Sequence, residues 1–412
     1  MFDAIIEKAT NLGLWAIGAG LVAVGVWAYP TIKGQLNETR PTTAVPPPTI
    51  SVDAVTQLVK GAEPGAKDAK GWAADILAVL NIHSLAQNKE NACSIIAIVD
   101  QESGFNANPA VPNLGKLSEK AVIEKLSKLS FLGSQAESFL NKFPNTQNSF
   151  MQRIRNAKTE RDLDMAYRDL MQGIEEYAKQ YKLSILFNNG FARDFIESRN
   201  EIDTIGSMQV AVDFAVQYEM ERRGGNALSL KEIYQVRDRL YTRQGGLYYG
   251  SLLLLGYPSG YDKKIYRFAD FNAGRYSSRN AAVQYIINTL SGKQLATDGD
   301  LMIYDSDGRV AATASSTELA LRELSNTQGL NLSETQIRRD LMKEKSLAFN
   351  DTTTYKTLIA AYRMKKKTYP PYAIVPGITL HSEKTSRVLT TAKFANTVYG
   401  RYQHCMANPH VH

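Results

Sequence analysis

Residues 93–105 read CSIIAIVDQESGF, and the other predicted elements are best understood by their relation to this stretch. It is apolar almost to its end, where a carboxylate, Glu102, precedes Gly104 by two positions. This pattern predicts a short buried helix that ends at the glycine, with Asn88 as its N-cap.

Glu102 places a carboxylate in an apolar setting. Ile95, Val99 and Glu102 are spaced i, i+4 and i+7, so they share one helix face. Lost hydration and the helix dipole in the last turn both disfavour the charged form, so we expect a raised pKa for Glu102. A general acid working near neutral pH needs such a pKa. Asp100 points to the polar side and is the weaker candidate, while a salt-bridged Glu102 is the non-catalytic alternative.

Composition is ordinary for a globular protein of 412 residues, with 44% hydrophobic and 22% charged side chains, which favours one to three domains. Residues 351–412 hold nine Lys or Arg against two Asp or Glu, and so account for the whole net charge of +7. A basic segment fits an anionic polymer or surface, or is simply a solvated face. The scattered histidines and the glycine spacing predict neither a metal site nor a cofactor.

The N-terminal region predicts a membrane anchor. After a segment of mixed composition, 1–11, residues 12–30 carry no charge and are long enough for a transmembrane helix. The alternative is a cleaved signal peptide with its cleavage site near 26–28. A Pro-rich linker is expected over 31–69, with its proline cluster at 41–48.

The remainder is predicted to be mainly α-helical. We expect a principal domain over 70–299, with a helical insertion over 110–200, and a basic C-terminal extension over 300–412 with a short β-hairpin at 306–308. Two cysteines, Cys93 and Cys405, permit one disulfide, which depends on the redox compartment.

Three short motifs follow one another, each at a predicted helix edge. The motifs are Glu102-Ser103, Gly206-Ser207-Met208-Gln209 and Phe271-Asn272-Ala273-Gly274. Their order resembles that of the soluble lytic transglycosylase and goose-type lysozyme superfamily, and the soluble portion resembles most closely an uncharacterised family of bacterial, membrane-associated, lysozyme-like proteins.

The resemblance implies a lysozyme-like helical domain and a peptidoglycan lytic transglycosylase. Glu102 would protonate the glycosidic oxygen between N-acetylmuramic acid and N-acetylglucosamine, and would then act as base while the muramic acid forms a 1,6-anhydro product. This scheme needs no second carboxylate, unlike that of most glycosidases. A hydrolase would need one, for which Asp213 and Asp270 are candidates, although each is more readily explained as structural.

The resemblance also assigns roles to the other motif residues. Ser103 would bond near the scissile sugar or its stem peptide, Asn272 would hold the groove and contact substrate, and Gly274 would permit a tight turn. The sugar subsite would be lined by Met208 and Gln209, and Gly206 is structural. In the oxidising envelope, Cys93 and Cys405 are expected to pair.

The chain departs from the superfamily pattern in two ways. Phe271 stands where a tyrosine is usual, and 104 positions separate Glu102 from Gly206, so the insertion must loop out and cap or reshape the groove. The hydroxyl that Phe271 lacks would have to come from Tyr248, Tyr249, Tyr266 or Tyr276.

These departures motivate the alternative of a catalytically inactive peptidoglycan-binding or scaffold component. In either case the resemblance implies a single-pass protein of the bacterial inner membrane with its folded domain in the periplasm. Its partners would be peptidoglycan glycan strands, the membrane and an envelope protein complex, and not nucleic acid.

Overall fold

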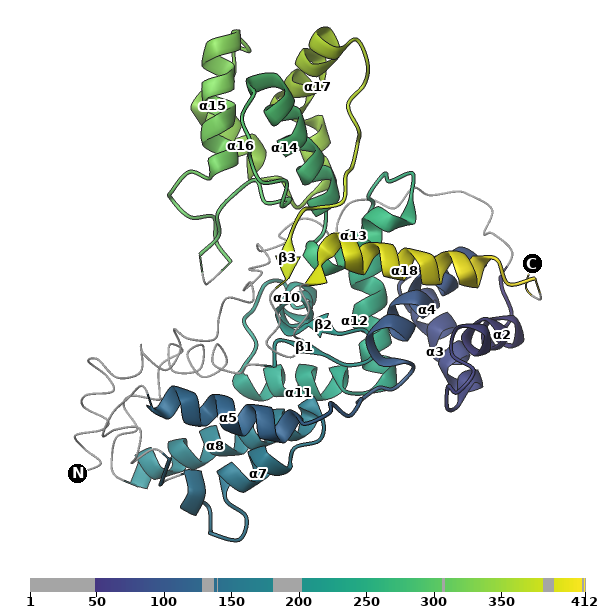
Figure 1. Cartoon of the computed structure of the whole chain (residues 1–412), viewed down its shortest axis with the longest axis vertical. Helices are drawn as coiled ribbons and strands as arrows, with labels where there is room; N and C mark the ends of the chain where they lie inside the picture. Colours follow the sequence, from purple (N-terminus) through teal and green to yellow (C-terminus); the bar gives the residue numbers. More distant parts are fainter. Residues whose placement is uncertain are drawn as a thin grey trace.

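The computed structural model describes residues 49–127, 137–138, 140–180, 202–305, 308–380, 389–409 and 411. These residues are mainly helical, as predicted, with two two-stranded antiparallel sheets among them (Figure 1). The N-terminal segment and the predicted transmembrane helix 12–30 lie outside the described residues. No helix within the described ranges is both long and apolar enough to cross a membrane.

The principal core is formed by helices from both ends of the chain. Val55, Leu58 and Val59 of α2 are at most 1% exposed within it, although α2 lies in the predicted linker 31–69. Among the described residues, the folded part therefore includes α2 and does not begin at residue 70. The helices are α2 (Val52–Ala62), α3 (Ala69–Ile82), α4 (Lys89–Ser103), α12 (Arg243–Leu255), α13 (Lys264–Ala273) and α18 (Thr391–Met406).

Helix α4 is the predicted buried helix. Its N-cap is Asn88, whose side chain accepts a hydrogen bond from the amide of Asn91 at 2.9 Å. The side chains from Cys93 to Val99 are at most 1% exposed, and Gly104, with φ of +55°, ends the helix. The predicted cap, burial and stop are confirmed.

A small hairpin precedes α10 (Val212–Arg222) and α11 (Leu230–Leu240). Strand β1 (Thr204–Ile205) pairs with β2 (Val210–Ala211), so residues 206–209 form the turn between them. The turn motif and the following helix are as predicted, whereas the two strands were not predicted because they are too short to show an alternating pattern.

The insertion contributes α5 (Leu114–Ser127), α7 (Phe150–Asn156) and α8 (Glu160–Gln180), which lie together at one end of the molecule (Figure 1). It has a small core of its own, which includes Phe150. Residues 181–200 of the predicted insertion lie outside the described residues.

A second lobe has a separate core and projects from the other end (Figure 1). This core begins inside α14, at Val283, so the predicted boundary at 300 falls too late. Of the predicted β-hairpin, residues 306–307 lie outside the described residues, and the flanking segments form an antiparallel bridge between Tyr304 and Val310. The helices of the lobe are α14 (Ser277–Ser291), α15 (Ser316–Gln328), α16 (Glu334–Leu341), the 3-10 helix η4 (Leu347–Asp351) and α17 (Thr353–Lys366).

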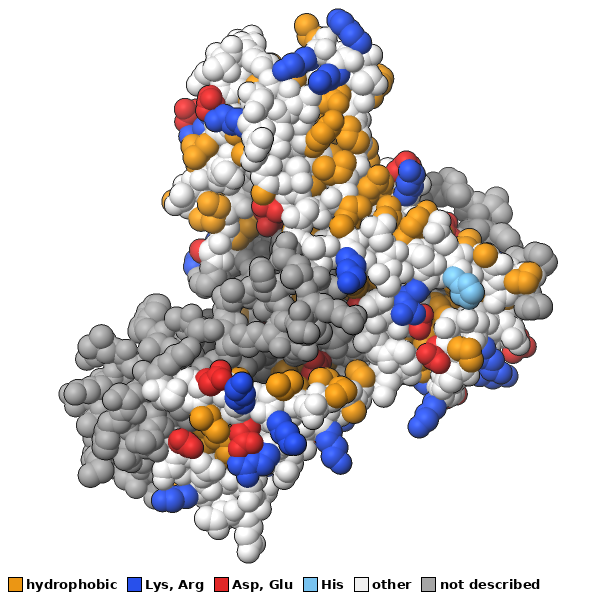
Figure 2. All heavy atoms as spheres, viewed as in Figure 1, with side chains coloured by type: hydrophobic (Ala, Val, Ile, Leu, Met, Phe, Trp, Pro, Cys, Tyr) orange, Lys and Arg blue, Asp and Glu red, His pale blue; other side chains and the backbone are white. Residues whose placement is uncertain are grey.

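Helix α18 returns from this lobe to the principal core, and the extension 300–412 is therefore not one unit. It packs on α4 and α13, and the strand pair β3 (Thr379–Leu380) and β4 (Leu389–Thr390) precedes it (Figure 1). The predicted basic residues are divided accordingly. On the face drawn in Figure 2, Lys and Arg side chains lie at the tip and side of the second lobe, over the principal domain and over the insertion, and do not gather into one patch.

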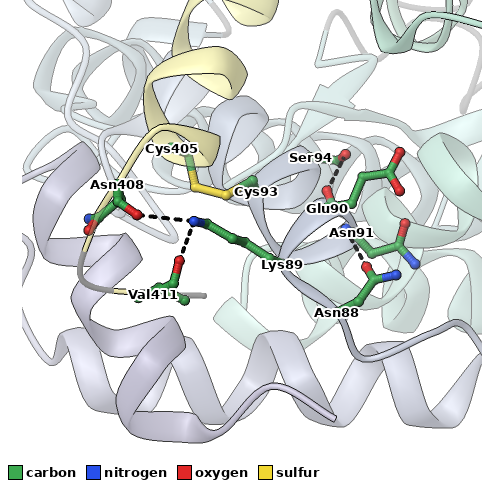
Figure 3. The surroundings of a disulfide bond; sticks show 9 residues. All are labelled: Asn88, Lys89, Glu90, Asn91, Cys93, Ser94, Cys405, Asn408 and Val411. Carbon is green, nitrogen blue, oxygen red and sulfur yellow. Dashed lines mark hydrogen bonds between the residues drawn. A yellow bond between two sulfur atoms is a disulfide. The ribbon is translucent and has the colours of Figure 1, made fainter. Parts of the chain in front are cut away.

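A disulfide joins Cys93 of α4 to Cys405 of α18, with their Cα atoms 5.6 Å apart (Figure 3). Beside it, Lys89 Nζ donates to the carbonyl oxygen of Asn408 at 3.0 Å and to that of Val411. The predicted pairing is confirmed, and it fixes the C-terminal end of the chain to the beginning of the Glu102 helix.

Candidate active site

The turn 206–209 is where several elements of the candidate site meet. Gly206 has φ of +85°, and a Cβ there would lie 2.2 Å from Leu240 O, so only glycine fits. Gln209 follows with φ of +47°, and its amide donates to Gly206 O at 3.0 Å. The turn is therefore tight, and it is pressed against the end of α11.

The end of α4 is bonded to this turn through Ser103. Ser103 Oγ lies 2.9 Å from Ser207 O and 3.0 Å from Val99 O, and its single proton is shared between the two carbonyls. The first and second sequence motifs are thus brought into direct contact, across the whole insertion.

Glu102 lies next to this contact and is partly exposed. Burial among protein atoms and, to a smaller extent, the charge of Glu160 raise its pKa, whereas the charge of Arg401 lowers it. The net result is a rise from 4.5 to about 7. The direction agrees with the sequence prediction, and burial, one of the two predicted causes, is the largest cause in the structure. A carboxyl group with this pKa is able to release and to recover a proton at neutral pH.

Helix α18 closes the other side of Glu102. Arg401 forms an ion pair with Asp100, and its Nε donates to Gln101 Oε1 at 3.2 Å. Burial raises the pKa of Asp100 despite the opposing effect of Arg401. Arg401 was predicted to belong to a separate C-terminal extension, and no local sequence pattern places it at the site.

The third motif joins the site through the same helix. Asn272 Oδ1 accepts from Thr391 Oγ1 at 2.9 Å, at the beginning of α18. Gly274 has φ of +98°, a conformation that favours glycine, as the predicted tight turn requires. α18 thus contacts both α4 beside Glu102 and the turn that holds Asn272.

Asp270 is a structural carboxylate. It is fully buried and accepts from the amides of Tyr276 at 2.8 Å and Ser278 at 2.7 Å, and from the hydroxyls of Tyr257 and Tyr261. It therefore orders the chain after Gly274. The other predicted alternative, Asp213, is exposed on α10.

The predicted tyrosine substitutes make their contacts elsewhere. Phe271 itself is only 7% exposed, in the principal core. The hydroxyl of Tyr249 donates to Glu219 at 2.7 Å, and that of Tyr276 donates to Pro258 O at 2.6 Å. The hydroxyls of Tyr248 and Tyr218 lie 3.2 Å apart. The ring of Tyr266 packs on that of Tyr261.

Met208 requires a correction. It is fully buried, and its Sδ would lie 2.3 Å from a Cβ at Gly250, so it packs under the turn and has no surface to present to a sugar. Gln209 is half-buried and held by Glu160, whose carboxylate accepts from Gln209 Nε2 at 3.3 Å. Within the described ranges, no cluster of three or more His, Cys, Asp or Glu is arranged to hold a metal.

Sequence reasoning missed two residues of this region. Glu160 is 8% exposed at the first position of α8, and Tyr241, 5% exposed, has a buried hydroxyl with no hydrogen-bond partner among the described residues. Burial raises the pKa of Tyr241, and the charges of Asp164 and Glu160 add to this. The only sequence signal for Glu160 is that it is an acidic residue at the start of a helix. That signal is explained equally well by the favourable interaction of a negative charge with the N-terminal end of a helix.

The matches to known proteins cover nearly the whole folded part of the chain. The chain is similar to "Uncharacterized protein YaiW" of Escherichia coli (strain K12), with 36% identity over 341 residues, which cover 82% of this chain and 86% of that protein. No solved structure matches the chain. The family model described as "Protein of unknown function (DUF1615)" matches residues 65–408, which include all three motifs, and the chain therefore belongs to this family.

Proposed function

We propose that this chain is a peptidoglycan lytic transglycosylase with a lysozyme-like fold and with Glu102 as its acid and base. The observation that carries the proposal is the setting of Glu102. It ends a buried apolar helix, its pKa is raised to about 7, and the adjacent Ser103 contacts the turn 206–209. The order of the three motifs along the sequence and the contact between the first and the second support the same conclusion.

The reaction uses one carboxyl group twice. Protonated Glu102 gives its proton to the glycosidic oxygen as the bond from C1 of N-acetylmuramic acid to that oxygen breaks. The carboxylate then takes the proton from the 6-hydroxyl of the same muramic acid while that oxygen bonds to C1. Glu102 is restored to its starting state, water is not consumed, and a pKa of about 7 suits both half-reactions.

The neighbouring residues have supporting roles in this scheme. Ser103 holds the end of α4 on the turn, and Gln209 and Asn272 present amide groups from the second and third motifs. Hydrogen bonds from such fixed groups orient a bound sugar with little loss of entropy on binding.

The proposed location is the periplasmic side of the bacterial inner membrane, with residues 12–30 as the anchor. The Cys93–Cys405 disulfide supports an oxidising compartment, since such bonds rarely persist in the cytosol. The proposed partners are peptidoglycan strands and, through the outer surface, an envelope protein complex. A role in binding nucleic acid is not proposed.

Digestion of purified sacculi tests the proposal, with the products identified by mass spectrometry. Wild-type protein is expected to release anhydro-muropeptides, and Glu102→Gln, which cannot transfer the proton, is expected to release at least about a hundredfold less. Release of reducing-end products without anhydro ends would identify a hydrolase and would contradict the transglycosylase mechanism.

The second candidate function is a catalytically silent peptidoglycan-binding component. Phe271 favours it, because this side chain is buried in the core and brings no hydroxyl to the site. Under this alternative, wild type and Glu102→Gln would bind sacculi equally in a sedimentation assay, and neither would release soluble products.

A further inference from the structure

The beginning of α8 is fixed against the principal domain because the insertion is closed at its base. Ala110 and Thr159 form an antiparallel bridge, and the amide of Val111 donates to Lys158 O at 2.9 Å. Glu160 is the next residue, and its side chain is 8% exposed. The insertion thus delivers a carboxyl group to the edge of the candidate site.

A buried ion network determines how α8 is rotated about its axis. Asp164, one turn after Glu160, accepts from Arg237 Nε of α11 at 3.0 Å and pairs with Arg168. Arg237 also donates to Ile202 O at 2.7 Å, and neither Asp164 nor Arg237 is more than 2% exposed. Because Asp164 lies one helical turn after Glu160, this ion network also determines the side of α8 from which the Glu160 side chain leaves the helix.

Glu160 contacts the same turn that holds the end of α4. Its Oε2 accepts from Gln209 Nε2 at 3.3 Å, and Thr204 Oγ1 donates to Gln209 Oε1 at 3.0 Å, so both ends of the Gln209 amide are held. Ser103, beside Glu102, is bonded to this turn through Ser207. Glu102 and Glu160 therefore stand on elements that share one turn.

We infer that Glu160 is a positioning residue of the candidate site: from the start of α8 it fixes the amide of Gln209 in the turn that also holds Ser103, and so acts on Glu102 across that turn. The inference rests on the proposed function, in which Glu102 is the acid. The charged groups that act on Glu102 come from two sides: Glu160 of α8 opposes its ionisation, while Arg401 of α18 favours it and is paired with Asp100. The insertion is thus part of the catalytic machinery and not only a cover for the groove.

The test is the midpoint of the Glu102 titration, followed by NMR of carbon-13-labelled glutamate carboxyl groups and assigned by its loss in Glu102→Gln. Replacing Glu160 by Gln removes one negative charge and keeps the shape, so we expect the midpoint to fall by about 0.5–1 pH unit. Glu160→Asp keeps the charge and is expected to stay within about 0.3 of a pH unit of wild type. Glu119→Gln, at a half-buried glutamate of the insertion that pairs with Arg155, is the matched control and is expected to leave the midpoint unchanged.

A melting curve verifies that each variant is folded, and Glu160→Met provides a second neutral variant that needs no hydrogen-bond partner in the buried position. An unchanged midpoint in a folded neutral variant would overturn the inference. The titration midpoint is measured without turnover, so this test is independent of the proposed function. Inactivity of wild type on sacculi would refute the transglycosylase. A midpoint in the neutral Glu160 variants equal to that of wild type would refute the role of Glu160. In an active protein, the alkaline limb of the pH–rate profile shifts down together with the midpoint.

Discussion

Ser103 Oγ lies 2.9 Å from the carbonyl oxygen of Ser207, and this contact joins two segments that are 104 residues apart. It places the end of the apolar helix on the turn that the second motif forms. The geometry of the candidate site depends on this junction, because Glu102 precedes Ser103 directly.

Ser103→Ala removes the junction. We expect it to lower the free energy of unfolding by about 1 kcal/mol, since Ser207 O loses its donor, and to reduce activity on sacculi by about tenfold through misplacement of Glu102. Urea unfolding and product release measure the two effects. Ser94→Ala is the matched control, because Ser94 donates only within α4, to Glu90 O at 2.7 Å. Equal losses of activity in both variants would contradict a special role of the Ser103 contact.

Gly206→Ala is expected to destabilise the protein by about 3 kcal/mol. The added Cβ would lie 2.2 Å from a backbone oxygen of α11, and the φ of +85° adds backbone strain. Gly224→Ala separates the two causes, since Gly224 has φ of +73° but no heavy atom within 4 Å of an added Cβ. A cost of only about 1 kcal/mol is expected there. Chemical denaturation of both variants makes the comparison, and similar costs would exclude the predicted clash.

The raised pKa of Glu102 makes stability depend on pH. Between pH 4.5 and about 7, the folded state retains a proton that the unfolded state releases, so stability falls as pH rises through this window. Gln does not titrate, so Glu102→Gln is expected to show a flatter profile and to be more stable than wild type at pH 8 by about 1–3 kcal/mol. Urea unfolding at several pH values measures this, and parallel profiles for the two proteins would refute it.

Removal of the disulfide by Cys93→Ser with Cys405→Ser is expected to cost about 2–5 kcal/mol of stability. Because α18 buries Glu102 as well as carrying Arg401, its release is expected to move the titration midpoint of Glu102 downward, since burial is the largest cause of the raised pKa and outweighs the effect of Arg401. Thermal melting and carboxyl NMR record the two effects, and wild type treated with reductant is expected to match the double variant. A midpoint that stays constant would show that α18 remains in place without the bond.

Tyr241→Phe is expected to leave stability unchanged or to raise it by up to about 1 kcal/mol, since the buried hydroxyl has no partner among the described residues. Tyr249→Phe, which breaks a 2.7 Å hydrogen bond to Glu219, is expected to cost about 1–2 kcal/mol. Melting temperatures distinguish these outcomes. A large loss of stability in Tyr241→Phe would indicate that its hydroxyl is bonded in solution.

The sequence was most informative where local rules govern the structure. The cap at Asn88, the stop at Gly104, the burial of α4 and the direction of the Glu102 pKa shift all follow from spacing and polarity between residues 88 and 104, and all are present. The positive φ values of Gly206 and Gly274 likewise follow from their turns.

Features that depend on distant parts of the chain were not predictable in this way. Burial of α2 depends on α3, α4 and α18, and the return of α18 from the second lobe has no local signal. Glu160 reads as an ordinary acidic residue at a helix start, and only the bridge between Ala110 and Thr159 places it at the site. Met208 was misassigned because a motif gives residue identity but not which side of the turn faces inward.

The bond between Cys93 and Cys405 closes most of the folded chain into one covalent ring. The insertion and the second lobe both belong to the segment of chain between the two cysteines. A protease that cuts the insertion or the second lobe once therefore produces a nicked molecule whose two polypeptides stay attached, with α4 and α18 still side by side. On a denaturing gel, such a molecule would run as one band without reductant and as two bands with it. Under native conditions its candidate site would be assembled from two separate polypeptides.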